Sequence, residues 1–326
     1  MRGQMASDLF ITGEWGSVSM HLTLCLNTGT GIQILETAHG AGVIGCPDFE
    51  AAFFATASAW YQTHGPLPVI LAGMIGSTIG WKDSGYILCP AQAGDLATGL
   101  TTFHARNASI NLSPGLRCHN MFGLPDVVRG EEMQVFGWLS EQDDHTQRVL
   151  CLPGRHVKWV VTQGKRIVSF FTGMNGEMED LLLDHSLLGR GVTRDTFSQT
   201  DFEAGLAALR ADPTLSLGHS LFATRSRLVL GDHNTAGAAS FLSGVLIGAD
   251  IRDALSAFQN RGLIDQPVIV MGHGTACDRY AHSFATFGQA IEVETRSLAT
   301  FGLAAVYSAG STISFHVDHL PRHEVG

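Results

Sequence analysis

Two short glycine turns, set half a chain apart, constrain the fold more than any other feature of this sequence. The first, residues 14–17 (EWGS), separates an apolar run at 9–11 from an alternating stretch at 20–24. The second, residues 153–156 (PGRH), separates the apolar runs 149–152 and 157–161. Each pattern predicts a strand, a tight turn and a returning strand. The repeat predicts two related domains that face each other across a cleft, and backbone N–H groups in such turns can bind phosphate.

The size and composition of the chain fit two globular domains. It has 326 residues, of which 45% are apolar and 15% are charged, and this favours a large core over disorder. We expect an N-terminal domain over residues 1–145 and a C-terminal domain over residues 146–326. The net charge is −10 and no basic stripe is present, so nucleic-acid binding is not expected.

Cysteine usage and apolar runs bear on the compartment. The six cysteines are scattered and form no Cys-x-x-Cys pair, which suits reduced thiols. Residues 1–8 lack the apolar stretch of a signal peptide, and no apolar run approaches the length that spans a membrane. These features predict a cytoplasmic protein without a membrane partner.

The order of predicted elements is the same in both halves. In the first half, strands are predicted at 9–12, 20–25, 32–36, 69–72 and 110–112, and helices at 49–61 and 131–139. In the second half, strands are predicted at 149–152, 157–161, 167–171, 268–271 and 291–294, and helices at 177–188, 241–255, 276–287 and 298–307. Residues 73–99 are expected to be a loop-bearing insertion, and residues 195–213 a helical excursion. Repeated alternation of strands and helices is typical of an α/β fold.

The motif Arg129-Gly130-Glu131-Glu132 places two carboxylates at the start of a predicted helix. Acidic residues favour helix N-termini in any case, because they complement the helix dipole. At the end of the first half, these carboxylates could also face the cleft. Both interpretations stay open at this point.

Other motifs are weaker. Gly272-His273-Gly274 follows a predicted strand and precedes a predicted helix, as a nucleotide-binding turn would, but a plain strand-to-helix turn explains it equally well. Neither a G-x-x-x-x-G-K-[ST] phosphate loop nor a G-x-S-x-G nucleophile turn is present.

Residues 76–82 (GSTIGWK) combine a flexible backbone, hydroxyls, an indole and an ammonium group. This mixture suits a hydroxylated anionic ligand, although a solvated loop whose Trp81 caps the core is an equal alternative. The tail at 316–323 is rich in histidine, but a polar terminus offers no supporting geometry. No metal site is predicted in the tail.

Several blocks of residues together carry a family resemblance. They are 72–77 (AGMIGS) with Gly80 and Trp81, 114–116, 126–134, 153–154 with His156, 158–159, 181–187 and 241–244. In this order they resemble the 2-dehydro-3-deoxygalactonokinase family, which belongs to the actin-like sugar kinases with the ribonuclease-H fold. The resemblance extends to about residue 307.

The resemblance implies an α/β fold of two ribonuclease-H-like domains with mixed sheets flanking a central cleft. It implies ATP- and Mg²⁺-dependent phosphorylation of 2-dehydro-3-deoxy-D-galactonate to the 6-phosphate, a step of galactonate catabolism. The implied partners are the sugar acid and ATP, and a homodimer is left open. Phosphoryl transfer depends mainly on positioning and charge stabilisation, so closure of the domains would shield the reaction from water.

The resemblance also implies roles for individual residues. Glu14 would hold the metal ion. Glu131 or Glu132 would accept the hydroxyl proton, with Asp126 as a third candidate. The remaining residues would bind phosphate or nucleotide (Gly16, Ser17, Gly154, Arg155, Gly272 and Gly274) or the sugar acid (Gly76, Ser77, Trp81 and Arg129).

The phosphate turns depart from the family pattern. The family's Asp-Trp-Gly-Ser-Thr corresponds to EWGSV at 14–18, and its Pro-Gly-Thr-His corresponds to PGRH at 153–156. Its Thr-Gly-Glu is NGE at 175–177, and an arginine of its first strand pair is His21. Mg²⁺ demands near-octahedral geometry, and the Arg155 guanidinium could bind phosphate or occupy its place. The hypotheses are therefore a kinase for this or another sugar acid, or a catalytically impaired relative that binds a sugar acid without phosphoryl transfer.

Overall fold

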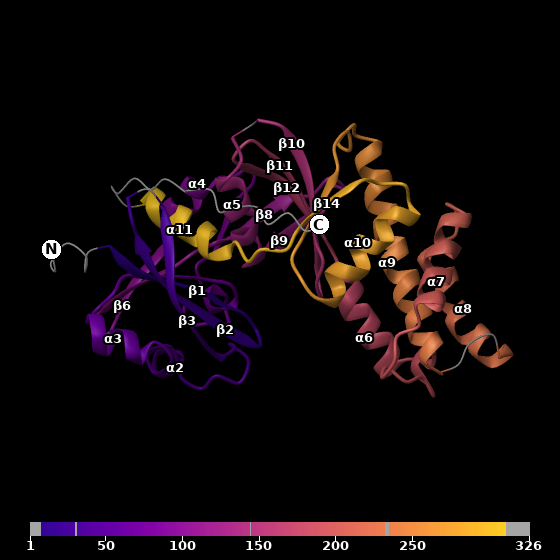
Figure 1. The fold of residues 1–326 in the computed structure, drawn as a ribbon, viewed down its shortest axis with the longest axis horizontal. Coiled ribbons are helices and arrows are strands. Elements are labelled where there is room, and N and C mark those ends of the chain that lie inside the picture. The colour runs from indigo at the N-terminus through magenta and orange to yellow at the C-terminus, as the bar shows by residue number, and fades with distance from the viewer. Residues whose placement is uncertain (1–7, 30, 144, 232–234, 311–326) are drawn as a thin grey trace. The chain divides into compact units, whose positions relative to one another are not determined.

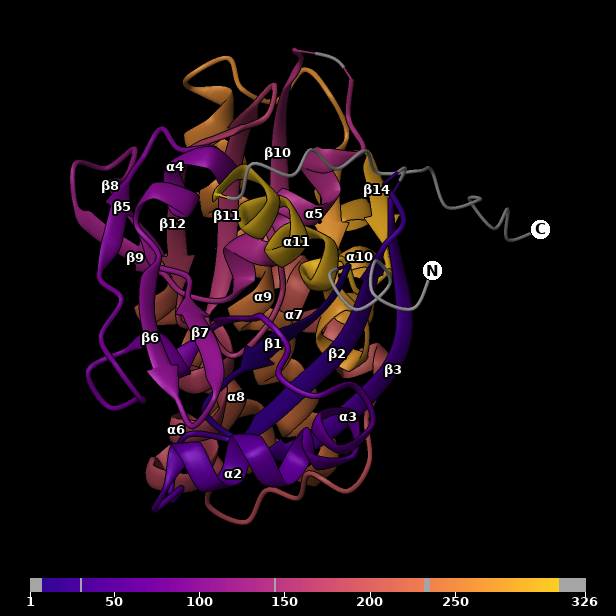
Figure 2. The ribbon, with the colours of Figure 1, turned by 90° about the vertical axis from the view of Figure 1, so that its left-hand side faces the viewer.

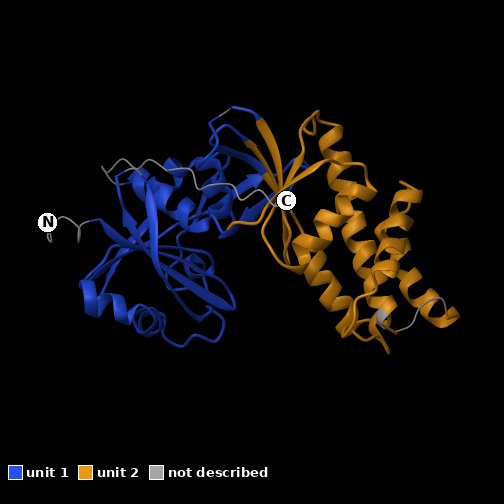
Figure 3. Cartoon of the chain, viewed as in Figure 1, with its two compact units in different colours: residues 1–146, 163–169, 297–326 blue, residues 147–162, 170–296 orange. Residues whose placement is uncertain are grey.

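The fold is known from a computed structural model, which describes residues 8–29, 31–143, 145–231 and 235–310. The chain divides into two compact units (Figure 3). Unit 1 comprises residues 1–146, 163–169 and 297–326, and unit 2 comprises residues 147–162 and 170–296. The histidine-rich tail at 316–323 lies outside the described residues.

Unit 1 is built on a six-stranded sheet with the order β3-β2-β1-β4-β7-β6 (Figure 2). Its strands are β1 (Leu9–Trp15), β2 (Ser19–Asn27), β3 (Ile32–Ala41), β4 (Val69–Ala72), β6 (Thr101–Ala105) and β7 (Ala108–Leu112). β1 pairs antiparallel with β2 and parallel with β4, so the sheet is mixed, as expected. The predicted first hairpin is confirmed.

One face of this sheet carries the core of unit 1. Strand alternation places Ile11 and Leu22 on this face, where they pack with Phe53. Two helices supply the other half of the core, α2 (Phe49–Thr56) and α3 (Ser58–His64). The sequence predicted one helix over 49–61, but α2 ends before residue 57 and a second helix starts at once.

The opposite face of the sheet is covered by α5 (Glu131–Ser140) and α11 (Ala299–Gly310), with α4 (Ala93–Thr98) packed against α11 (Figure 2). Phe10 of β1 stacks on Tyr307 of α11, with ring centroids 5.4 Å apart. A Cβ on Gly302 would clash with the backbone of α5, so α5 and α11 approach each other closely only because this residue is glycine.

This packing differs from the expected domain boundary. Residues 297–310 were expected in the C-terminal domain, but they belong to unit 1, as do residues 163–169. The reason for the first difference is the close contact between α11, α5 and the first sheet. For residues 163–169, the reason is a backbone bridge in which Ala91 and Ile167 exchange two N–H···O bonds of 2.9 Å.

A second, three-stranded sheet of unit 1 has the order β5-β8-β9, with β5 (Tyr86–Leu88), β8 (Gly115–His119) and β9 (Pro125–Val128). The segment expected as a loop-bearing insertion at 73–99 therefore contains β5, α4 and the single turn η1 (Met74–Gly76). These elements are three to six residues long, too short for a periodic pattern to reveal.

Unit 2 is built on a five-stranded sheet with the order β12-β11-β10-β13-β14. The strands are β10 (Gln147–Leu152), β11 (Val157–Gln163), β12 (Arg166–Gly173), β13 (Val268–Met271) and β14 (Ile291–Glu294). Both main sheets thus begin with the same order: third strand, second, first, fourth. The predicted repeat and the α/β class are confirmed.

The helices of unit 2 follow its third strand (Figure 1). They are α6 (Asn175–His185), the single turn η2 (Leu187–Gly189), α7 (Gln199–Ala211), α8 (Leu217–Leu230), α9 (Thr235–Gln259) and α10 (Thr275–Thr286). α7 confirms the expected helical excursion, whereas α8 was not predicted. Phe222, Val229 and Leu230 of α8 are exposed, so α8 lacks the clear apolar stripe that periodicity detects.

No helix in the described part of the chain is long and apolar enough to cross a membrane. The six cysteines are all free thiols, and four of them are buried.

Candidate active site

Three chain segments of unit 1 converge because two glycines allow it. Gly73 ends β4 with φ 95°, and a Cβ there would lie 2.8 Å from the carbonyl oxygen of Trp15 at the end of β1. Gly130 precedes α5 with φ 113°, and a Cβ there would lie 3.3 Å from the Cα of Gly73. The ends of β1 and β4 and the start of α5 therefore meet at one point, the Trp15–Gly73–Gly130 junction.

Two of the predicted site carboxylates lie at this junction. Glu14 is half-buried on β1, and Glu131 is the exposed first residue of α5. Burial, followed by the charge of Glu131, raises the pKa of Glu14 from 4.5 to about 7. Since the two carboxylates repel each other, a cation between them would be stabilised.

Glu132 has a different environment from its neighbour. Its side chain is only 2% exposed, and one carboxylate oxygen accepts a 2.6 Å hydrogen bond from the Gly130 N–H. The other oxygen has no partner in the described part of the chain. Burial, followed by the charge of Glu131, raises the pKa of Glu132 to about 8. At neutral pH this group is therefore mostly uncharged and is sealed from a substrate.

Asp126, the third candidate base, lies on β9 of the small sheet. Its carboxylate accepts hydrogen bonds from the Asn120 side chain at 3.3 Å and from the Val127 N–H at 2.9 Å. These contacts hold the turn between β8 and β9. Of the three candidates, Glu131 is thus the exposed one at the junction.

The first predicted phosphate turn follows Glu14 directly. The carbonyls of Gly16 and Ser17 accept 2.9 Å hydrogen bonds from the N–H groups of Val43 and Ile44. Among the described residues, the N–H groups of Ser17 and Val18 have no hydrogen-bond partner. The Val18 side chain is 84% exposed, so this turn presents two free N–H groups beside an apolar surface.

Arg129 is occupied by contacts within unit 1. It donates hydrogen bonds to the Ser84 hydroxyl at 2.7 Å and to the Gly85 carbonyl at 2.8 Å, and it stacks on the Tyr86 ring. A Cβ on Gly76 would lie 3.0 Å from an Arg129 nitrogen, so this glycine makes room for the guanidinium. The structure therefore brings Gly76 and Arg129 together, with the guanidinium anchoring residues 84–86.

The other two predicted sugar-side residues lie close by in the chain but face different surroundings. The Ser77 hydroxyl donates to the Met74 carbonyl at 2.7 Å. Trp81 is half-buried and lies edge-on to Trp15 and Phe103, with ring centroids 6.5 Å and 5.1 Å away. Trp81 therefore packs against the core, as the alternative interpretation expected.

The second phosphate turn lies in unit 2, between β10 and β11. The Arg155 side chain is 62% exposed, and its guanidinium lies 3.8 Å from the Glu177 carboxylate. His156 hydrogen-bonds the other oxygen of Glu177. That hydrogen bond, followed by the charges of His156 and Arg155, lowers the pKa of Glu177. Within the described residues, the N–H groups of Gly154 and Arg155 are without a hydrogen-bond partner.

The N-terminus of α6 packs directly on this turn. The Glu177 N–H donates to the Arg155 carbonyl at 3.2 Å, and a Cβ on Gly176 would lie 2.7 Å from the Arg155 Cα. Sequence analysis gave no site role to Glu177. The NGE segment at 175–177, where the family has Thr-Gly-Glu, was the signal that could have identified it.

Asp250 of α9 was also missed. It accepts hydrogen bonds from the Trp159 indole at 3.0 Å and from the Tyr280 hydroxyl at 2.9 Å, and it is bonded to the Asn175 side chain. Burial raises its pKa to about 6. Asp250 thereby ties β11, α10 and the start of α6 together. An acidic residue within an apolar helical run was the available signal.

Gly272 and Gly274 stand between β13 and α10, with φ 127° and 85°. A Cβ on Gly272 would lie 2.9 Å from the Cys277 sulfur, whereas a Cβ on Gly274 would meet nothing within 4 Å. A separate pocket of about 190 Å³ is lined by residues that include Glu179, Phe197, Ser243 and Arg279. This pocket lies wholly within unit 2.

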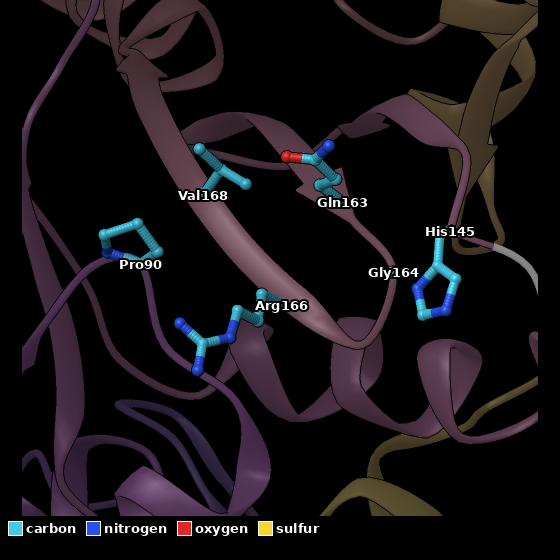
Figure 4. Close-up of a pocket in the computed structure, with 6 residues that line it drawn as sticks. All are labelled: Pro90, His145, Gln163, Gly164, Arg166 and Val168. Atoms are coloured by element: carbon cyan, nitrogen blue, oxygen red, sulfur yellow. The ribbon is translucent and has the colours of Figure 1, made fainter.

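A larger pocket, of about 440 Å³, lies in unit 1 and is lined by Pro90, His145, Gln163, Gly164, Arg166 and Val168 (Figure 4). None of the predicted site residues lines it. In the described part of the chain, no group of three or more His, Cys, Asp or Glu side chains is arranged to hold a metal ion. A metal at Glu14 would therefore take most of its ligands from water or substrate.

Comparisons with known proteins give a consistent result. The family model described as 2-keto-3-deoxy-galactonokinase matches residues 14–306. The chain is 35% identical over 283 residues to the 2-dehydro-3-deoxygalactonokinase of Escherichia coli (strain K12), covering 86% of this chain and 90% of that protein. It is 32% identical over 246 residues to a Rhizobium meliloti (strain 1021) protein assigned to the same activity, covering 74% and 79%.

A solved structure agrees with these matches. A Sinorhizobium meliloti protein assigned as a 2-dehydro-3-deoxygalactonokinase superposes with a TM-score of 0.79 at 29% identity, covering 92% of this chain and 97% of that one. The family comprises kinases, which transfer a phosphoryl group to an alcohol. This chain belongs to the 2-keto-3-deoxy-galactonokinase family.

Proposed function

We propose that this protein is a cytoplasmic, ATP-dependent kinase that phosphorylates the terminal hydroxyl of 2-dehydro-3-deoxy-D-galactonate. The observation that carries the proposal is the pairing of Glu14 and Glu131 at the Trp15–Gly73–Gly130 junction, in a chain of this kinase family. A kinase needs a base for the acceptor hydroxyl and a centre of negative charge that holds Mg²⁺.

Glu131 is the proposed general base. It accepts the proton of the terminal hydroxyl, whose oxygen forms a bond to the γ-phosphorus while the bond to the β,γ-bridging oxygen breaks and ADP leaves. Glu131 is exposed and can therefore contact a substrate, whereas Glu132 is only 2% exposed and cannot.

Glu14 is the proposed protein ligand of Mg²⁺. Burial and the charge of Glu131 raise its pKa, so a bound cation would stabilise the ionised carboxylate, and a carboxylate oxygen is the donor that Mg²⁺ prefers. When bound, the ion would neutralise charge on the phosphates of ATP. Glu14 is one methylene longer than the aspartate that the family has at this position. Replacing Glu14 with Asp would show whether the longer side chain limits catalysis.

The free N–H groups of the two turns are the proposed phosphate contacts, Ser17 and Val18 in unit 1 and Gly154 and Arg155 in unit 2. We assign the nucleoside to Gly272 and Gly274, where a Cβ on Gly274 would meet nothing within 4 Å. The Arg155 guanidinium lies 3.8 Å from the Glu177 carboxylate. The impaired alternative rests on Arg155 together with Glu14 and Val18, the three departures from the family's phosphate turns.

The sugar acid is assigned to unit 1, next to Ser77 and the segment that Arg129 anchors. Because the Arg129 guanidinium already donates to Ser84 and Gly85, we propose that it fixes the shape of this surface. The side chain is only 5% exposed, which leaves little of it for direct contact with the substrate carboxylate.

The test is a coupled ADP-release assay with ATP, Mg²⁺ and a panel of 2-keto-3-deoxy sugar acids. We expect turnover that requires all three components, a fall in kcat of about 10²–10⁴ in Glu131→Gln, and near-normal kcat in the matched control Glu132→Gln. Absence of turnover at high enzyme concentration with every sugar acid would reject the kinase. A large rate increase in the triple variant Glu14→Asp, Val18→Thr, Arg155→Thr would instead identify an impaired native site.

A further inference from the structure

A pair of histidines on the first sheet has no role in the proposed reaction. His21 of β2 and His39 of β3 are directly opposite in the antiparallel ladder. Their Nδ1 atoms lie 2.8 Å apart, the ring centroids are 4.8 Å apart, and the rings are inclined by 82°. Both side chains are exposed to solvent.

The close approach of the two rings places one Nδ1 atom within hydrogen-bond distance of the other. A hydrogen bond between two Nδ1 atoms requires that one ring donates its N–H and that the other accepts. The Nε2 of His21 lies 3.1 Å from the Ser19 hydroxyl, which orients the ring. If His21 donates its Nε2–H to Ser19, its Nδ1 is the acceptor and His39 is the donor.

We propose that His21 and His39 form a binding site for a divalent transition metal, with the two Nδ1 atoms as ligands and water in the remaining positions. Neutral imidazole is the commonest metal ligand in proteins, and it suits Cu²⁺, Ni²⁺ and Zn²⁺ rather than Mg²⁺. On binding, the shared proton moves from His39 Nδ1 to His39 Nε2 through solvent, so both rings stay neutral.

The spacing of the two nitrogens distinguishes between metals. With metal–nitrogen bonds of about 2.0–2.1 Å, two ligands at a right angle are about 2.9 Å apart, and two ligands at a tetrahedral angle are about 3.3 Å apart. The observed 2.8 Å is close to the first value. A metal would take the place of the shared proton once each ring turns its Nδ1 lone pair off the line between the two nitrogens, and ligands kept at this spacing would suit the right-angled geometry of Cu²⁺ and Ni²⁺.

The position of the pair in the sheet leaves it open to solvent. Further along the same face, the hydroxyls of Thr300 in α11 and Thr23 in β2 are 3.4 Å apart, so α11 covers the sheet there. His21 is also the ladder partner of Glu14 on β1, so the two side chains lie on the same face. A metal held by nitrogen would thus sit beside, and be distinct from, an Mg²⁺ held by the Glu14 carboxylate.

The site is tested by titrating tag-free, EDTA-treated full-length protein with CuSO₄ at pH 7.5, using calorimetry and electron paramagnetic resonance. The variants are His21→Gln and His39→Gln, and the matched control is His104→Gln, an exposed strand histidine outside the pair. We expect the native chain and His104→Gln to bind one more equivalent of Cu²⁺ than either pair variant. The spectrum of that equivalent should show hyperfine coupling from two nitrogens.

The histidines of residues 311–326 are present in all four proteins, so the difference between them isolates the pair. A hundredfold excess of Mg²⁺ should not displace the additional Cu²⁺. Equal stoichiometry and affinity in all four proteins would overturn the proposal, as would coupling from a single nitrogen. Because the readout is binding, failure of the metal site leaves the proposed kinase activity untouched.

Discussion

The buried Glu132 carboxyl makes the stability of unit 1 depend on pH. It keeps its proton up to about pH 8 in the folded chain, compared with an ordinary value of 4.5. Between these two values the folded state binds the proton and the unfolded state does not, so the free energy of unfolding falls as pH rises. Glutamine has the shape of the protonated acid and no proton to lose. Replacing Glu132 with Gln should therefore remove this fall.

The size of the effect follows from the two pKa values. From pH 5 to pH 8, the native chain should lose roughly 3–4 kcal/mol relative to Glu132→Gln, since each unit of pH within the window costs about 1.4 kcal/mol. The variant should be comparable to the native chain at pH 5, because its side-chain oxygen still accepts from the Gly130 N–H. At pH 8 the variant should be the more stable protein.

The assay is urea denaturation of both proteins at pH 5, 6, 7 and 8, followed by tryptophan fluorescence. All other titrating groups are common to the two chains, so the difference between their unfolding free energies isolates Glu132. A control variant, Glu292→Gln, changes an exposed carboxylate on β14 and should show a constant difference from the native chain. A constant difference for Glu132→Gln as well would refute the argument.

Three further predictions follow from the geometry. Gly73→Ala combines backbone strain at φ 95° and ψ −157° with a clash against Trp15. Gly65→Ala has similar strain, at φ 76° and ψ −157°, but in open space, and should cost about 1–3 kcal/mol. Gly73→Ala should therefore destabilise the protein more than Gly65→Ala, and equal losses in thermal denaturation would contradict the argument. Asp250→Ala leaves the Trp159 and Tyr280 donors unpaired and should lower the free energy of unfolding by about 1–3 kcal/mol for each donor. Asp250→Asn keeps an acceptor oxygen and should lose less stability than Asp250→Ala in the same denaturation assay. Mg²⁺ binds the ionised form of Glu14, whose pKa is about 7, so the apparent Mg²⁺ affinity of the native enzyme should fall about tenfold from pH 8 to pH 6. The affinity is measured from the Mg²⁺ dependence of kcat. A similar fall in Glu14→Gln would show that another group is responsible.

Much of the fold could be predicted from local patterns. The two hairpin turns, the buried strands β4 and β13 and the helix α5 each carry a signal in a few consecutive residues, and the structure confirms them. The helix α8 and the short strands β5, β8 and β9 could not be predicted, because their pattern is brief or their apolar residues stay exposed. The membership of α11 in unit 1 depends on contacts with residues far away in the chain.

The candidate site shows the same limit. Sequence alone placed Glu131 and Glu132 at the start of a helix but could not distinguish them. The distinction arises from burial. One side of α5 packs against the core, and because successive residues of a helix point in different directions, Glu132 is buried while Glu131 is exposed. The convergence of β1 and the start of α5, which lets the charge of Glu131 act on Glu14, likewise depends on Gly73. Gly73 is an ordinary glycine in the sequence and becomes informative only when its neighbours are known.

The placement of α11 in unit 1 has a consequence for biosynthesis. The N-terminal unit lacks the helix that covers Phe10 and Cys25 until the ribosome has added about 150 residues beyond position 146, roughly 8–30 s at typical elongation rates. During that interval the nascent chain exposes one face of its first sheet while unit 2 is being translated. A premature stop before codon 297 would therefore leave Phe10 and Cys25 without the helix that covers them, and would harm the beginning of the molecule as well as its end.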